Sequence, residues 1–79
     1  MKLGYHGHAR DRMAERGVTE ADVEHALLHH TERLRTPQNS MRYIGPGLDG
    51  RRQLKVWVKL PDTNPGDDKV VKSVAWKGE

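Results

Sequence analysis

The sequence predicts a small α+β domain in which two helices come first and an antiparallel sheet of three or four strands follows. Three observations lead to this fold class. Apolar residues recur at helical spacing through the first 30 residues, and they alternate at strand spacing in the segments beyond. Glycine, proline and asparagine cluster between these segments. Helices that bury one face against such a sheet form a two-layer domain.

The first helix is expected over 7–16. Ala9, Met13 and Arg16 lie at positions i, i+4 and i+7, which fall on one face of a helix. Gly17 follows, and glycine commonly ends a helix because it adopts the left-handed conformation without a Cβ clash. The apolar residues of this face are expected to turn toward the sheet.

The second helix is expected over 20–30. Thr19 is a favourable N-cap, and Asp22 occupies the third helical position, where a carboxylate can accept backbone hydrogen bonds. Val18 and Val23 have the spacing of a hydrophobic staple. These signals fix where the second helix begins.

The clearest strand is expected over 53–60. Its apolar side chains alternate with polar and aromatic ones, so the two sets point to opposite faces of the sheet. Shorter strands are expected over 32–35 and 41–45, and 2–5 could add one more. One face of the clearest strand carries Leu54, Val56 and Val58, and the other carries Gln53, Lys55, Trp57 and Lys59.

The last strand is expected over 69–77. Uninterrupted alternation divides its side chains between the two faces of the sheet. One face carries Val71, Ser73 and Ala75, and the other carries Val70, Lys72, Val74 and Trp76.

The length of 79 residues predicts a single domain over 1–79. A chain of this size has a small core, so its stability can gain from a partner or from a homodimer. The predicted core consists of Leu3, Ala9, Met13, Val23, Ala26, Leu27, Leu34, Ile44, Leu54, Val56, Val58, Val71 and Val74, with parts of the aromatic residues.

The composition excludes several classes of site. The chain has no cysteine, so a disulfide framework and a thiolate zinc site are both excluded. No apolar run has the length that crosses a membrane, so a cytoplasmic location without a membrane partner is expected. The net charge of +3 weakly favours an anionic partner.

The chain carries the side chains that metal-independent RNA cleavage requires. A base must take the 2′-OH proton, an acid must protonate the leaving 5′-oxygen, and cations must stabilise the phosphorane. Histidine can serve as acid or base near neutral pH, while arginine and lysine hold phosphate. An alternative for the arginines of the first helix is that they only pair with neighbouring acidic residues. The candidate catalytic residues are His8, Arg12, Arg16, Tyr43 and Lys55.

A second set of residues can bind a nucleic acid on the uncovered face of the sheet. Aromatic side chains stack on unpaired bases, and cationic side chains contact phosphates. For the two tryptophans, the alternative is packing against neighbouring strands. This set consists of Arg42, Arg52, Trp57, Lys59 and Trp76.

Two other interpretations are weaker. His25 and His29 have the i, i+4 spacing of metal ligands, but nothing obvious completes a coordination set, so no metal site and no cofactor are expected. A helix-turn-helix DNA reader is disfavoured because the second helix is acidic, and phosphates would repel it.

The segment 8–27, HARDRMAERGVTEADVEHAL, resembles the DUF4258 family of small bacterial domains. The later strands resemble the family as well, so the likeness covers nearly all of the chain. The matching motifs are His8-Ala9, Arg12-Met13, Arg16-Gly17-Val18, Thr19, Met41-Arg42-Tyr43, the strand 53–58 and the closing strand 70–77.

This resemblance implies a fold shared with barnase-like, RelE-like and colicin-type ribonucleases. It implies a metal-independent ribonuclease toxin that an antitoxin or immunity protein restrains. His8 would then be the acid or base, and Arg12 and Arg16 would hold phosphate or stabilise the transition state. Lys55 and Tyr43 are added on chemical grounds. The alternative is a module of the same fold that binds nucleic acid or protein without catalysis.

Overall fold

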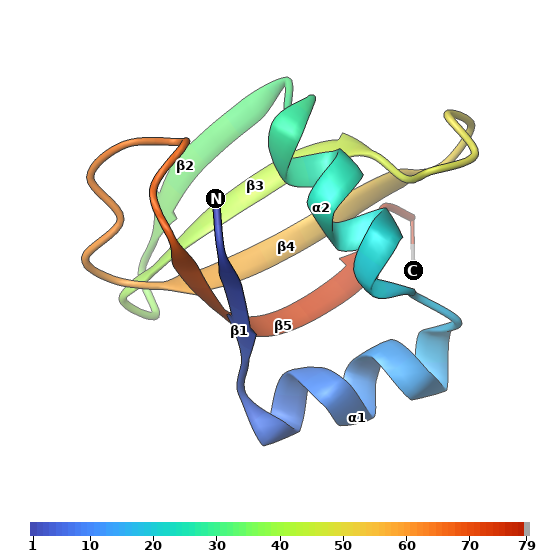
Figure 1. Ribbon diagram of the computed structural model, residues 1–79, viewed down its shortest axis with the longest axis horizontal. Helices are drawn as coiled ribbons and strands as arrows, with labels where there is room; N and C mark the ends of the chain where they lie inside the picture. Colours follow the sequence, from blue (N-terminus) through green and yellow to red (C-terminus); the bar gives the residue numbers. More distant parts are fainter. Residues whose placement is uncertain (79) are drawn as a thin grey trace.

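A short strand comes first in the chain, two helices follow it, and four strands complete the fold (Figure 1). The structure is a computed structural model that describes residues 1–78. Both helices and the four later strands lie within two residues of their predicted bounds. The elements are β1 (Leu3–Tyr5), α1 (Gly7–Arg16), α2 (Glu20–Leu28), β2 (Glu32–Thr36), β3 (Ser40–Pro46), β4 (Gln53–Lys59) and β5 (Lys69–Trp76).

The sheet has five strands in the order β1-β5-β4-β3-β2. Strands β2 to β5 form an antiparallel meander, whereas β1 runs parallel to β5. The prediction of three or four antiparallel strands was therefore wrong, and the sheet is mixed. The cause is the start of the chain, because Leu3 and Tyr5 pack against the core and bring β1 beside β5.

The ends of the helices follow from their sequences. Gly17 adopts φ 63° after α1, and Thr19 and Asp22 form a reciprocal capping box at the start of α2. Helix α2 ends at Leu28, two residues before its predicted end. Nδ1 of the His30 ring lies 2.8 Å from the carbonyl oxygen of Leu27. This contact takes the place of the backbone hydrogen bond that a further helical turn would give that carbonyl.

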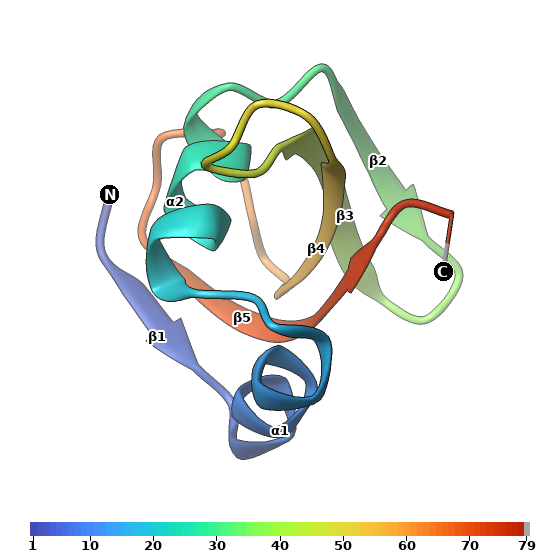
Figure 2. The same ribbon diagram turned by 90° about the vertical axis from the view of Figure 1, so that its right-hand side faces the viewer.

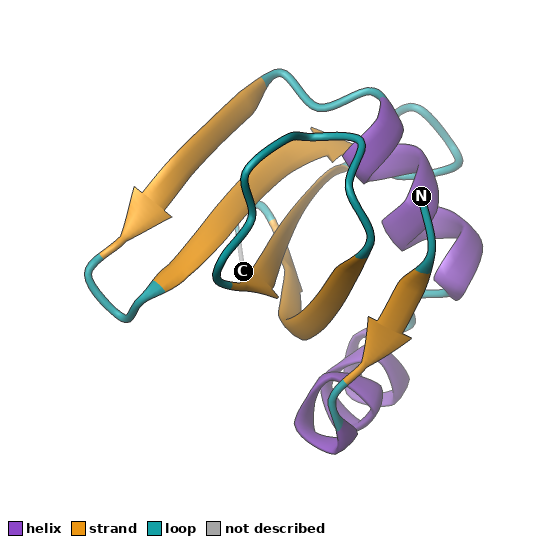
Figure 3. Cartoon of the chain, turned by 60° about the vertical axis from the view of Figure 1, so that its left-hand side comes forward, coloured by secondary structure: helices purple, strands orange, loops and turns teal. Residues whose placement is uncertain are grey.

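Helix α2 lies inside the curve of the sheet, whereas α1 lies on the other side of β5, along the part of its edge that β1 leaves unpaired (Figures 2 and 3). Helix α1 packs along β5, and α2 packs across β3 and β4, where the sheet curves around it. Gly45 allows this close approach, because a Cβ there would lie 2.2 Å from the carbonyl oxygen of Ala26. We call the face opposite α2 the open face; within residues 1–78, only the start of α1 reaches it.

The core lies between the helices and the sheet. Nearly all of the predicted core residues are buried or pack against the buried cluster. Leu34 is the exception: it is 50% exposed, because β2 is an edge strand and the side chain points to the open face. Tyr43 and Trp76 are buried in the core as well. Neither helix in residues 1–78 is long and apolar enough to cross a membrane.

A β-bulge in β5 changes which side chains reach the core. Trp57 pairs with Ser73, whereas the next residue of β4, Val58, pairs with Val71, so Lys72 is an extra residue on β5. Val71 and Val74 are therefore both buried in the core. Uninterrupted alternation had put them on opposite faces, and this prediction was wrong because alternation does not continue through a bulge.

Candidate functional site

His8 lies beside the open face of the sheet, at a depression of about 400 Å³ that we call the His8 depression. Helix α1, strands β3, β4 and β5 and the turn between β2 and β3 each contribute to it. Its walls bring together an imidazole, an ammonium group, an indole ring and two hydroxyl groups. The lining residues are His8, Gln38, Ser40, Trp57, Lys72 and Ser73.

Local sequence explains why these side chains meet. His8 lies in the first turn of α1, which follows β1 directly and so begins beside β5. The bulge turns Lys72 toward the open face, where its Nζ donates a hydrogen bond to Ser40 Oγ (2.8 Å). Trp57 is half-buried on β4 opposite Ser73.

The charge at this depression favours an anion. Lys72 forms no salt bridge with any carboxylate of residues 1–78. The first turn of α1 contains no acidic residue, so the positive end of the helix dipole is not neutralised there. Lys55 adds a second cation nearby, with its Nζ 5.8 Å from the centre of the Trp57 ring. The depression can therefore hold a phosphate beside an exposed imidazole and an aromatic surface.

The arginines of α1 have other partners. Arg12 pairs with Glu15 on the helix surface (3.0 Å). Arg16 donates to the backbone carbonyl of Val74 (2.7 Å), and the indole N–H of Trp76 donates to the carbonyl of Arg16 (2.8 Å). Strand β1 pairs with only the first part of β5, so the carbonyl of Val74 lies on an edge that has no neighbouring strand. Arg16 provides the hydrogen bond that a neighbouring strand would otherwise make. Neither arginine lines the His8 depression, so the structure does not bring the predicted catalytic set together.

Tyr43 lies in the core, where it belongs to a buried ionic network that we call the Asp62 cluster. Its hydroxyl donates to Asp62 Oδ2 (2.5 Å) and accepts from Arg33 Nε (2.9 Å). Lys69 Nζ pairs with Asp62 Oδ1 (2.5 Å), and both side chains are almost fully buried. Arg33 also binds the backbone carbonyl of Asp62. The predicted catalytic role of Tyr43 conflicts with this position, because Tyr43 has no exposed surface.

The Asp62 cluster shifts the pKa of its carboxyl group. Burial raises the pKa of Asp62, but hydrogen bonds from Lys69 and Tyr43 and the positive charges of Lys69 and Arg33 lower it by more. The net result is a pKa below the ordinary value. The cluster ties the loop 60–68 to the inner side of the sheet, so its charges serve the fold.

The predicted nucleic-acid-binding residues divide into two groups. Trp57 and Lys59 lie on the open face, as the alternation in β4 predicted. Arg42 lies opposite Trp57 on the same face but pairs with Glu32 (2.9 Å), and Arg52 stacks on the Trp76 ring with 3.9 Å to the ring centre. Trp76 is only 2% exposed, so it cannot stack on a base, and its alternative role in packing applies.

Sequence reasoning missed Lys72, Ser40 and Gln38. Regular alternation places Lys72 on the face of Val74 and Trp76, because it does not account for the bulge. Ser40 and Gln38 lie at a turn whose position over the open face follows only from the pairing of β3 with β4. A lysine that interrupts a run of valines in β5 was the available signal.

His25 of α2 and His29, the C-cap of this helix, lie away from the His8 depression. His25 Nδ1 is 3.0 Å from the carbonyl oxygen of Pro46, and its ring stacks against that of His29. Among residues 1–78, no three His, Cys, Asp or Glu side chains are placed to hold a metal ion.

Comparison with known proteins gives one match. A family model described as a domain of unknown function, DUF4258, matches residues 5–76. Searches of the curated proteins and of the solved structures found no match. The matched range includes α1, α2 and the four strands from β2 to β5. The chain therefore belongs to the DUF4258 family.

Proposed function

We propose that this protein is a metal-independent endoribonuclease whose active site is the His8 depression. One observation carries the proposal: the depression combines the exposed imidazole of His8 with the ammonium of Lys72 and the ring of Trp57. These groups supply a proton acceptor, a phosphate contact and a surface on which a base can stack.

In this mechanism, the 2′-oxygen of the substrate attacks the adjacent phosphorus. His8 takes the 2′-OH proton as the new O–P bond forms, and the bond from phosphorus to the 5′-oxygen breaks. Lys72 stabilises the negative charge of the phosphorane, with Ser40 holding the ammonium in place. His6, which lines the adjoining depression, is the second imidazole near Lys72 and supplies the proton for the leaving oxygen. The products are a 2′,3′-cyclic phosphate and a 5′-hydroxyl.

The same proposal extends to the biological setting. The order of two helices followed by an antiparallel meander supports a relation to the RelE-like and barnase-like ribonuclease toxins. Such a toxin would act on RNA in the bacterial cytoplasm, and an antitoxin or immunity protein would restrain it. The expected homodimer stays a prediction.

A second candidate function is RNA binding without cleavage. Arg12 and Arg16, the guanidinium groups expected to stabilise the transition state, are held by Glu15 and by the backbone of β5. Lys72 and Trp57 would still bind phosphate and base. This module would retain affinity for RNA and leave it intact.

One experiment separates these functions. Wild-type protein, His8→Ala and His29→Gln are incubated with a fluorogenic RNA oligonucleotide in EDTA. We expect the wild type and the His29→Gln control, whose histidine is exposed at the C-cap of α2, to cleave equally. His8→Ala should be slower by roughly 10²- to 10⁴-fold, the usual contribution of general acid–base catalysis.

The products and the binding data complete this test. Mass spectrometry should find 2′,3′-cyclic phosphate ends on the cleaved RNA. Binding without cleavage by the wild type would support the second candidate function. If the wild type neither binds nor cleaves RNA, both candidate functions are overturned.

A further inference from the structure

The His8 depression continues along the open face into two further hollows. The next one, of about 320 Å³, shares Gln38 and Lys72 with it and adds His6 and Lys59. The third, of about 450 Å³, shares Lys59 with the second. Because each hollow shares lining residues with the next, the three form one groove that runs from Trp57 to β1.

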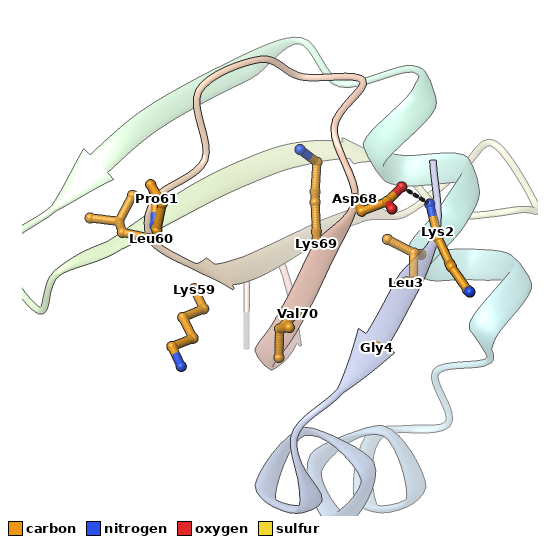
Figure 4. Close-up of a pocket in the computed structure, with 9 residues that line it drawn as sticks. All are labelled: Lys2, Leu3, Gly4, Lys59, Leu60, Pro61, Asp68, Lys69 and Val70. Atoms are coloured by element: carbon orange, nitrogen blue, oxygen red, sulfur yellow. Dashed lines mark hydrogen bonds between the residues drawn. The ribbon is translucent and has the colours of Figure 1, made fainter.

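The third hollow, which we call the β1 slot, has apolar walls (Figure 4). Leu60 and Pro61 line one side, and Val70 and Gly4 line the other. Strands β4 and β5 stop pairing at Val58. The end of β4 and the beginning of β5 therefore diverge there and leave this space open. The slot therefore offers apolar surfaces of the kind that contact the face of a base.

Cations alternate with these apolar surfaces along the groove. Lys72 lies between Trp57 and the middle hollow, Lys59 lies between the middle hollow and the slot, and Lys2 lies at the far wall. Lys59 makes no salt bridge with a carboxylate of residues 1–78, and Lys69 points away into the Asp62 cluster. Asp68 is the one carboxylate lining the groove in the described chain, and it accepts the backbone N–H of Lys2 (2.8 Å).

We propose that this groove binds single-stranded RNA over at least three consecutive nucleotides. One base stacks on Trp57, the phosphates that follow contact Lys72 and Lys59, and a further base enters the β1 slot. This inference rests on the proposed function, because it assigns the substrate of the same site. A duplex is excluded, since its bases are stacked on one another and cannot present their faces to the indole ring and the slot.

Oligonucleotides of increasing length test the groove. Binding of 2′-O-methyl RNA, which cannot be cleaved by 2′-OH attack, is measured by fluorescence anisotropy from a dinucleotide to a hexanucleotide. We expect the hexanucleotide to bind roughly tenfold more tightly than the dinucleotide, because it gains a stacking surface and a phosphate contact. A duplex of the same sequence should bind more weakly than the single strand.

Two variants test the far end of the groove. Gly4→Val narrows the slot, and its Cβ would lie at an ordinary 3.8 Å from Val70 Cγ2. Lys59→Ala removes an exposed cation that lies outside the core. Both variants should remove most of the increase in affinity between the dinucleotide and the hexanucleotide. Their affinity for the dinucleotide should stay unchanged. Lys77→Ala, which removes an exposed lysine outside the groove, is the control for net charge.

The outcomes separate this inference from the proposed function. Length-dependent binding without cleavage of ordinary RNA would support the groove and overturn the ribonuclease. Cleavage with equal affinity for all lengths, or with wild-type binding by Gly4→Val and Lys59→Ala, would overturn the groove alone. Single-stranded DNA of the same sequence shows whether the groove requires ribose or accepts either backbone.

Discussion

Lys69 and Lys72 are three residues apart in β5, yet they lie in opposite environments. The ammonium group of Lys69 is fully buried and is held by Asp62 and by the carbonyl of Asn64. The ammonium group of Lys72 lies at the open face and has a hydroxyl, Ser40, as its partner. Only the second lysine has positive charge to offer to a ligand.

This difference shows why total charge is a poor guide to function in so small a domain. Of the cations predicted to contact RNA, Arg12 and Arg42 are each paired with a carboxylate, and Arg16 holds a backbone carbonyl. The charge that remains available lies on the lysines of β4 and β5. Substitutions in each group therefore test whether the cations that hold the fold are separate from those that can bind.

The largest effect is expected in the Asp62 cluster. Asp62→Ala leaves Lys69 buried without its carboxylate and should cost about 3–5 kcal/mol in the free energy of unfolding. Urea denaturation followed by circular dichroism measures this loss. Asp11→Ala, at an exposed position of α1, should change stability by less than about 0.5 kcal/mol. Equal stability of the two variants would show that the cluster does not hold the fold.

A smaller loss of stability is expected from the arginines of α1. Arg16→Met removes a charged donor from the carbonyl of Val74 and should cost about 1.5–3 kcal/mol. Arg12→Met removes only a surface ion pair and should cost less than about 1 kcal/mol. Thermal and urea unfolding compare the two. If catalysis fell with Arg12→Met while stability was unchanged, Arg12 would belong to the active site after all.

The lowered pKa of Asp62 predicts a loss of stability in acid. A carboxyl group whose pKa is depressed in the folded state stabilises the protein above its unfolded-state pKa, near 3.9. That contribution disappears as the pH falls through the folded-state pKa. Unfolding measured between neutral pH and pH 2 should show a weaker pH dependence for Asp62→Asn than for the wild type. Asp22, whose pKa is also lowered, titrates in both proteins and cancels in the comparison.

The smallest effect is expected from Lys72, which is partly buried at the open face. Lys72→Met keeps the aliphatic stem but removes the charge and its hydrogen bond to the buried Ser40, so it should cost about 1 kcal/mol in stability. The dependence of log affinity for single-stranded RNA on log salt concentration should become shallower by about 0.7. Anisotropy titrations at several salt concentrations measure this slope. An unchanged slope would place the phosphate contact elsewhere.

The local signals in the sequence predicted the elements better than the environments of their side chains. Thr19, Asp22 and Gly17 act through their own backbone, so both helix boundaries at the α1–α2 turn were predicted correctly. Tyr43 and Lys69 have the same chemistry whether buried or exposed, and only long-range pairing decides which they are. Asp62 becomes a structural residue because its loop folds back over the core, which no local pattern indicates.

Long-range pairing also limits how much of the candidate site can be predicted from the sequence. The structure places two of the candidate residues, His8 and Trp57, at the same depression. The accompanying cation was assigned to the wrong element, because the arginines of α1 have partners that lie far away in the sequence.

The extra residue in β5 has an evolutionary consequence. Deleting Lys72 would restore regular pairing, and the same deletion would remove the ammonium group from the groove. Inserting a residue just before it would make the spacing between Val71 and Val74 even, so regular alternation would return and turn Lys72 toward the core. Relatives that conserve this groove must therefore keep the length of β5 at this point unchanged, even where the identities of the surrounding residues differ.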